Sequence, residues 1–255
     1  MKNQRPLLFL LAAVNFTHIT DLVLLIPLQP TLLTLWKINA KQFGIVMAAY
    51  TLAAAVSSLI ATYFIDRHDR RPVLLLTYGG FALGTLACAF ATGYMSMVVA
   101  RAVTGFFGGM IGALVLAIVS DCFPIQERGR AMGVITGALA VAFILGIPAG
   151  MVLANMFDWH APFFFLAAVA GLVWLGLFKV MPSMRGHCVE GAVRSGLIAT
   201  LDRAFRDANQ RKALMLAGML ILSAVMIITF LPAYLSRNVG LTETDMQYLL
   251  FAAGG

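Results

Sequence analysis

Recurring apolar stretches constrain the fold of this chain more than any other feature of its sequence. An apolar helix of about 20 residues is long enough to cross a hydrocarbon core of about 30 Å. We expect seven such spans and the beginning of an eighth near Met246. The seven cover 7–28, 41–64, 72–93, 95–120, 131–154, 161–181 and 212–236. Because lipid offers no hydrogen-bond partner to an open backbone, each span is predicted to be α-helical.

The composition excludes a soluble globular domain. Only 11% of the residues are charged and 61% are hydrophobic, whereas a soluble domain carries about 25% charged residues. The alternation of apolar and polar residues that is typical of a transmembrane barrel strand is absent. The fold class predicted is therefore an all-α membrane protein.

The basic residues set the orientation of the chain rather than a nucleic-acid site. With the spans given above, most of the 18 Lys and Arg residues fall on one side of the membrane. These are Lys2, Arg5, Arg67, Arg70, Arg71, Arg128, Arg130, Lys179, Arg185, Arg194, Arg203, Arg206, Arg211 and Lys212. Cytoplasmic loops are enriched in Lys and Arg. We therefore expect a multi-pass protein of the bacterial inner membrane, with its N-terminus in the cytoplasm.

Three segments are predicted along the chain. Residues 1–182 form a six-span bundle, and 183–211 form a cytoplasmic linker that contains either an amphipathic surface helix or a solvated helix. Residues 212–255 form an incomplete second bundle, with the seventh span and the start of an eighth. The chain is therefore expected to be a C-terminally truncated fragment.

A polar stripe lies within the first span. Asn15, His18 and Asp21 recur at every third residue and share one helix face. An intramembrane carboxylate is costly and normally faces a cavity or a partner. Asp21 is thus a candidate for proton binding or cation attraction, with His18 tuning it or binding substrate. The structural alternatives are an ion pair or an interfacial carboxylate for Asp21, and backbone contacts for His18.

Arg101 is expected at the same depth as Asp21. A pair of the two would offset much of the cost of both charges, and its separation could couple a proton to a conformational change. In the alternative interpretation, Arg101 extends to the outer headgroups.

Two cytoplasmic turns mix acids with bases, although orientation alone needs only bases. The candidates for an interlocked cytoplasmic gate are Asp66, Arg67, Arg70, Arg71 and Asp121. Solvated loops would explain the arginines but not the acids.

Small residues in the fourth and fifth spans predict close helix contacts and, at the proline, a bend. They are Gly105, Gly133, Gly146, Pro148 and Gly150.

These residues resemble the Major Facilitator Superfamily, in particular its proton-driven drug and sugar efflux branch. In the loop motif Gly-x-x-x-Asp-Arg/Lys-x-Gly-Arg-Arg/Lys, the matches are Asp66, Arg67, Arg70 and Arg71, while Thr62 and Asp69 replace the glycines. Arg101 and Gly105 match the fourth-span motif Arg-x-x-x-Gly. In the fifth-span antiporter motif Gly133, Gly146 and Gly150 fit, but Pro148 is displaced by one residue.

The resemblance implies a fold of two six-span halves, each with 3+3 inverted repeats, around a midplane site. It therefore implies that a missing C-terminal half is required for a complete transporter. It also implies that Asp66 and Arg70 belong to the cytoplasmic gate, with Asp121 as the partner of Arg70, and that Arg101 takes part in proton coupling. The expected function is proton-coupled efflux of a small organic molecule, drug-like or sugar-like, by alternating access. The displaced proline keeps proton-coupled uptake open.

Other classes fit less well. A membrane-embedded lipid phosphotransferase would need clustered carboxylates for Mg²⁺, and Asp66 and Asp69 are interleaved with arginines that would repel the ion. A seven-helix receptor would have its N-terminus on the other side. We therefore predict no enzyme activity and no cofactor. We also predict no metal site, because the three cysteines, Cys88, Cys122 and Cys188, lack the spacing of metal ligands.

Overall fold

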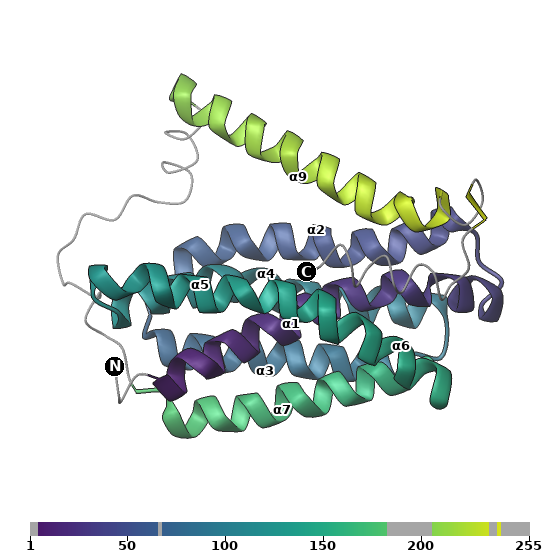
Figure 1. The fold of residues 1–255 in the computed structure, drawn as a ribbon, viewed down its shortest axis with the longest axis horizontal. Coiled ribbons are helices and arrows are strands. Elements are labelled where there is room, and N and C mark those ends of the chain that lie inside the picture. The colour runs from purple at the N-terminus through teal and green to yellow at the C-terminus, as the bar shows by residue number, and fades with distance from the viewer. Residues whose placement is uncertain (1–4, 66–67, 183–205, 235–238, 241–255) are drawn as a thin grey trace. The chain divides into compact units, whose positions relative to one another are not determined.

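All regular elements in the described part of the chain are helices (Figure 1). The computed structural model describes residues 5–65, 68–182, 206–234 and 239–240. The chain divides into two compact units, Met1–Val189 and Glu190–Gly255. The first contains α1 (Arg5–Leu35), α2 (Ala40–Ile65), α3 (Arg70–Ala89), α4 (Tyr94–Cys122), α5 (Ile125–Val141), the π-helical segment η1 (Ala142–Gly146), α6 (Ile147–Met156) and α7 (Ala161–Val180). The second contains α9 (Ala208–Tyr234).

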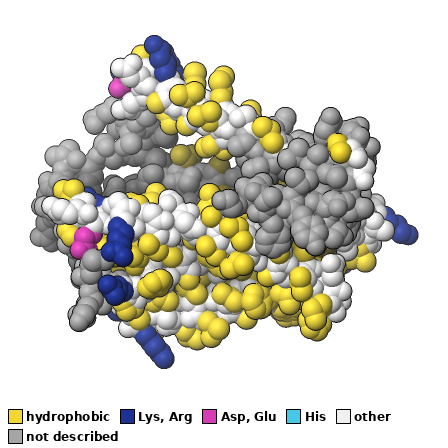
Figure 2. Space-filling model, viewed as in Figure 1, with side chains coloured by type: hydrophobic (Ala, Val, Ile, Leu, Met, Phe, Trp, Pro, Cys, Tyr) yellow, Lys and Arg dark blue, Asp and Glu magenta, His cyan; other side chains and the backbone are white. Residues whose placement is uncertain are grey.

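Six helical stretches within the described residues are long and apolar enough to cross a membrane. They coincide with the first six predicted spans, and α9 falls on the seventh. Hydrophobic side chains cover much of the visible surface, with charged side chains gathered towards the helix ends (Figure 2). This distribution suits a lipid environment, because lipid takes the place of water around the apolar faces. The predicted amphipathic helix of the linker and the start of the eighth span lie outside the described residues.

Short polar side chains fix where three of the helices begin. Before α2, Asn39 and Gln42 exchange side chain-to-backbone hydrogen bonds of 2.9 Å in both directions. Asp69 caps α3 by accepting a hydrogen bond of 3.0 Å from the backbone N–H of Arg71, and Ser96 accepts one from the N–H of Gly93 before α4. These bonds satisfy backbone N–H groups that a helix start leaves without intrahelical acceptors.

The first helix is longer than predicted. The sequence predicts a span that ends at residue 28, but α1 continues through Pro27 and Pro30 to Leu35. Neighbouring helices and hydroxyl side chains can satisfy the backbone groups that a proline frees in a membrane helix. Pro27 and Pro30 have no N–H, so the carbonyls that lose a donor are those of Val23 and Ile26, four residues before each proline. The prolines therefore lie within the helix.

The fifth span is helical from Ile125 to Met156, and one turn within it is wider than an α-helical turn. The N–H of Ile147 donates to the carbonyl of Ala142, which is the π-helical spacing. Pro148 follows directly and has no N–H to donate, so a regular ladder could not continue across it. The bend expected at Pro148 thus takes the form of η1, because a wide turn absorbs the irregularity.

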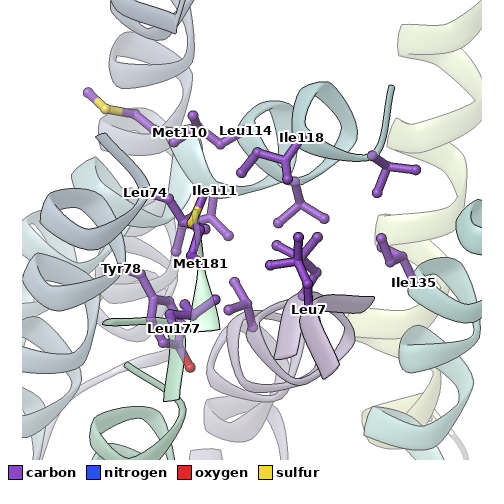
Figure 3. Close-up of a cluster of buried hydrophobic side chains, with 14 of the residues drawn as sticks. Leu7, Leu74, Tyr78, Met110, Ile111, Leu114, Ile118, Ile135, Leu177 and Met181 are labelled. Atoms are coloured by element: carbon purple, nitrogen blue, oxygen red, sulfur yellow. The ribbon is translucent and has the colours of Figure 1, made fainter. Parts of the chain in front are cut away.

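The core of the first unit consists of two apolar clusters. The first cluster joins α1, α3, α4, α5 and α7; Figure 3 shows part of it, with Leu7, Leu74, Ile111, Ile135 and Leu177 converging from these five helices. The second cluster joins α1, α2, α3, α4 and α7 and includes Leu24, Leu28, Met97, Trp159 and Phe163. In both clusters α4 is central, since it also packs against α1, α2, α3 and α5.

Glycines let three pairs of helix segments approach closely. A β-carbon at residue 105 would lie 2.7 Å from the Cα of Tyr50 on α2, so only glycine fits there. Gly146 faces Thr20 and Gly150 faces Leu24, both on α1. Gly133, in contrast, has open space around it among the described residues. Gly105, Gly146 and Gly150 therefore make the close contacts expected of them, and Gly133 does not.

Replacement of Gly105 by alanine is expected to destabilise the bundle by about 1–3 kcal/mol, because the new methyl group meets backbone atoms that cannot rotate away. The matched control is Gly112→Ala on the same helix, where a β-carbon would meet nothing within 4 Å. Thermal unfolding in detergent should show a lower midpoint for Gly105→Ala alone. Equal midpoints for the two variants would contradict the close contact.

Candidate polar site

Buried polar side chains separate the two apolar clusters. On α1 they follow Leu7, Leu11 and Val14 of the first cluster and precede Leu24 and Leu25 of the second. We call this set the polar layer: Thr17, Thr20, Asp21, Thr85, Arg101 and Thr104, all buried. With apolar residues on both sides, charges in the layer interact more strongly than they would in water.

Asp21 and Arg101 form an ion pair at the centre of the layer. Arg101 Nη1 donates to Asp21 Oδ2 at 2.9 Å and to the backbone carbonyl of Asp21 at 3.0 Å. The Asp21 side chain is 0% exposed and the Arg101 side chain 1% exposed. Thr85 of α3 donates to the other carboxylate oxygen, Oδ1, at 3.1 Å. The contact that the similar depths of the two residues predict is therefore present, and Arg101 does not extend to the headgroups.

Two aromatic rings complete the surroundings of Arg101. The guanidinium carbon lies 5.2 Å from the ring centroid of Phe163 on α7 and 5.8 Å from that of Tyr50 on α2, distances at which a ring attracts a cation. Arg101 Nε and Nη2 are buried and have no hydrogen-bond acceptor among the described residues. One carboxylate and two rings thus hold a cation that still has unused donors.

The other members of the polar stripe have different neighbours. Asn15 donates to the carbonyl of Ile135 at 2.8 Å and so ties α1 to α5. The ring of His18 makes an edge-to-face contact with Phe81 of α3, with centroids 5.8 Å apart. Its Cδ2 and Nε2 atoms lie 3.3 Å from the point that a β-carbon of Gly108 would occupy. Of the stripe, only Asp21 contacts Arg101.

The cytoplasmic ends of α3 and α4 are joined by a second ion pair. Arg70 Nε donates to Asp121 Oδ2 at 2.8 Å, and the side chains are 7% and 29% exposed, respectively. Two further arginines bind backbone oxygens at helix C-termini: Arg71 Nη2 donates to Phe178 at 2.9 Å, and Arg128 donates to Ser120 and Phe123. Arg71 therefore caps α7. Asp66 and Arg67 lie outside the residues whose side chains are described.

Within the described part of the chain, no three His, Cys, Asp or Glu side chains cluster as metal ligands would. The polar layer instead offers one buried carboxylate and one buried cation. Such a pair can take up a proton and change the helix contacts that depend on it.

Sequence reasoning missed Tyr50 and Thr85, which both contact the pair. Neither residue type is unusual in a membrane helix, so the sequence carries no signal for them. The contact of Tyr50 depends on α2 and α4 lying as close as Gly105 permits. Only the packing of the helices identifies these residues.

A family model described as Major Facilitator Superfamily matches residues 11–255. Among curated relatives, the chain is 32% identical over 178 residues to the uncharacterized MFS-type transporter YceJ of Bacillus subtilis, covering 70% of this chain and 45% of that protein. It is 28% identical over 169 residues to multidrug resistance protein 2 of Bacillus subtilis, covering 66% of this chain and 42% of the relative. The chain thus spans about half the length of these relatives.

Two further matches concern an efflux pump and the fold. The efflux pump dotC of Dothistroma septosporum is 34% identical over 127 residues, which cover 50% of this chain and 22% of the pump. A crystal structure of a bacterial homolog to the human lysosomal transporter Spinster, inward-facing and unoccupied, aligns with a TM-score of 0.77 at 15% identity. This alignment covers 99% of this chain and 59% of the other. At that identity it shows the fold alone.

Proposed function

This chain belongs to the Major Facilitator Superfamily, and we propose that it forms one half of a transporter that exports a small organic molecule in exchange for protons. The family consists of multi-pass membrane transporters rather than enzymes. In the proposal, the six-helix unit pairs with a second half, and substrate and proton bind alternately as the halves rock. The N-terminus lies in the cytoplasm, and the membrane is the bacterial inner membrane.

The observation that carries the proposal is the ion pair between Asp21 and Arg101. Both groups are fully buried, and the pair joins α1 to α4 within a layer that also contacts α2, α3 and α7. Protonation of Asp21 would remove one charge and weaken the pair, so the helices that it joins could rearrange. Coupling a proton to a conformational change needs such a group, whose charge stabilises one arrangement of helices over another.

The direction of transport is proposed from the relatives. Multidrug resistance protein 2 and the efflux pump dotC are named for resistance and efflux. The displaced Pro148 favours uptake as the second candidate. In the fifth-span antiporter motif the proline belongs at the place that Ile147 occupies here, so this chain departs from the motif that is typical of exchange for protons.

Flux measurements in proteoliposomes test the proposal. The chain is reconstituted together with a complementing second half, and candidate drugs and sugars are followed with and without an imposed pH gradient. Efflux predicts that substrate moves against the proton flow, and uptake predicts that the two move together. Flux that ignores the pH gradient for every compound transported would contradict proton coupling.

We also propose that Arg70 and Asp121 close the cytoplasmic side. Cys122 is adjacent to Asp121 and partly exposed, so it can report on opening. In a background of Cys88→Ala and Cys188→Ser, Arg70→Gln is expected to increase labelling of Cys122 by an impermeant maleimide about tenfold. This corresponds to the loss of about 1.5 kcal/mol from a charged hydrogen bond.

The matched control for this measurement is Arg71→Gln, which removes a neighbouring cation whose bond goes to Phe178. Loss of a cation near Cys122 lowers the thiolate fraction, so faster labelling of Arg70→Gln cannot arise from a more reactive thiol. If Arg70→Gln and Arg71→Gln label at the same rate, the pair is not a gate.

A further inference from the structure

An apolar groove runs along the surface of the six-helix unit where α3, α4 and α7 meet, with a volume of about 1060 Å³. On α3 its lining extends from Pro72, near the start of the helix, to Ala87, near its end. The helix rises about 22 Å over this stretch, which is most of the hydrocarbon thickness of about 30 Å. Leu76 and Leu83 line the groove and are exposed, so it opens to the surroundings of the unit and not to its core.

The groove offers a bound molecule no polar partner. None of the described side chains that line it is charged. Its polar side-chain groups are bonded within the unit: the Ser96 hydroxyl donates to the carbonyl of Gly93 and the Trp174 indole N–H to that of Leu75, each at 2.8 Å. An occupant must therefore present hydrocarbon to the groove, because a buried polar group without a partner is costly.

Aromatic rings already cover the glycines of α3 in this groove. A β-carbon at residue 79 would lie 2.9 Å from Trp174 Nε1, and one at residue 80 would lie 2.5 Å from the ring of Phe107. Transmembrane helices associate closely where small residues let their backbones approach. Since rings of the same unit cover Gly79 and Gly80, the groove favours a slender, flexible chain over another helix.

A cation lies at the end of the groove where α3 begins. Arg71 precedes Pro72, and its Nη2 donates to the carbonyl of Phe178 at 2.9 Å. The guanidinium carbon lies 5.8 Å from the centroid of the Phe178 ring, which stacks on Trp174 with centroids 6.0 Å apart. These contacts place the guanidinium beside the wall of the groove. A second cation, the exposed Lys179, follows Phe178 in the last turn of α7.

Arg71 has donors left for a ligand. Its side chain carries five N–H donors, of which the bond to Phe178 uses one, and the residue is partly exposed. The adjacent acid along the chain, Asp69, accepts from the backbone N–H of Arg71 as the cap of α3. A guanidinium binds phosphate oxygens in a defined planar geometry, and basic residues next to a membrane helix attract anionic headgroups. In the orientation proposed above, this end faces the cytoplasmic leaflet.

We propose that the groove binds an anionic phospholipid, with its phosphate at Arg71 and Lys179 and one acyl chain beside Trp174. Lipid tails are as apolar as leucine side chains, so the groove accepts the chain of any phospholipid and the headgroup decides which class is preferred. A phospholipid matches both the apolar lining and the cations at its end. The site is separate from the polar layer and does not depend on whether Asp21 binds a proton.

Quenching of Trp174 fluorescence by brominated lipids tests the site, because bromine on an acyl chain quenches an indole that it contacts. Trp36→Phe and Trp159→Phe leave Trp174 as the single tryptophan of the chain. The full chain is placed in phosphatidylcholine vesicles that contain an equal small fraction of brominated phosphatidylglycerol or brominated phosphatidylcholine. The apparent affinity at Trp174 should be about 25-fold higher for the anionic lipid, since each of two cations contributes about fivefold.

Charge variants identify the headgroup site. Arg71→Gln and Lys179→Gln should each reduce the preference for the anionic lipid about fivefold, and the two together should remove it. Arg71→Lys keeps the charge and should keep most of the preference. Arg130→Gln removes an exposed cation near the start of α5, outside the groove, and should leave the preference unchanged.

Leu172 provides a control for ordinary lipid contact. It lies two residues from Trp174 on α7, is exposed and does not line the groove. With Trp174→Phe and Leu172→Trp in the same background, the indole reports on lipid outside the groove. It should be quenched equally by the two brominated lipids.

Three outcomes would overturn the proposal. The first is equal quenching of Trp174 by both lipids. The second is weak quenching of Trp174 by either lipid beside normal quenching at residue 172, because protein from a second half or another copy of the chain would then cover the groove. The third is a preference that survives Arg71→Gln/Lys179→Gln or falls as much in Arg130→Gln, since the overall charge of the surface would then explain it.

Discussion

Asp21→Asn is expected to abolish the response of transport to a pH gradient. Asparagine has the shape of aspartate, and its amide oxygen can accept from Arg101 in the place of Oδ2, to which Arg101 donates at 2.9 Å. Its amide nitrogen takes the place of Oδ1, where Thr85 donates at 3.1 Å, and the Thr85 hydroxyl can turn to accept from it. Asparagine has no proton to exchange near neutral pH. Flux driven by an imposed pH gradient in proteoliposomes should therefore fall to the level of liposomes without protein.

Exchange of substrate for substrate without a gradient is the control, since it needs alternating access but no net proton movement. Asp21→Asn should keep this exchange. A second control, Asp158→Asn, removes an exposed acid from the loop before α7 and should leave gradient-driven flux unchanged. Gradient-driven flux that survives in Asp21→Asn would mean that another group binds the coupling proton.

Removal of Arg101 alone is expected to have the largest effect on stability. Arg101→Leu leaves the Asp21 carboxylate buried without its cation, and breaking a buried ion pair from one side costs about 3–5 kcal/mol. Leucine also loses the contacts with Tyr50 and Phe163. The free energy of unfolding, measured in mixed micelles, should fall by this amount.

The double variant Asp21→Leu/Arg101→Leu shows whether the unpaired charge or the lost packing causes the loss of stability. Replacing a whole buried pair by apolar residues is often neutral or stabilising by about 1–4 kcal/mol. The double variant should therefore be more stable than Arg101→Leu, although it cannot couple protons. If the double variant were as unstable as the sum of the single ones, packing rather than charge would explain the loss.

Some features of the site can be predicted from the sequence because they depend on the free-energy cost of a charge inside an apolar span. A carboxylate and an arginine inside apolar spans each demand a partner, and similar depth along their helices points to Asp21 and Arg101. The cost of a charge alone could not separate Arg70 from the adjacent Arg71, and only the family resemblance pointed to Arg70 as the partner of Asp121. In the structure Arg70 faces Asp121, whereas Arg71 caps α7 through Phe178.

The polar stripe shows the opposite limit. Asn15, His18 and Asp21 share a helix face in sequence, but three different helices receive them. Spacing gives the direction of a side chain from its own helix and contains nothing about the neighbouring helix. The relevance of Tyr50 depends entirely on its neighbours, since a tyrosine in a membrane helix is ordinary until its ring lies beside a buried cation.

The sequence by itself determined that the chain crosses a membrane as helices, because lipid cannot satisfy an open backbone and roughly 20 apolar residues match the hydrocarbon thickness. It also determined which charges need partners. The tertiary structure alone decided how far α1 continues past its prolines, where the fifth span widens, and which side chains surround the ion pair. These features depend on contacts between residues far apart in the chain, such as Thr85 with Asp21 and Tyr50 with Arg101. The close packing of helices at glycines determines which of these contacts form.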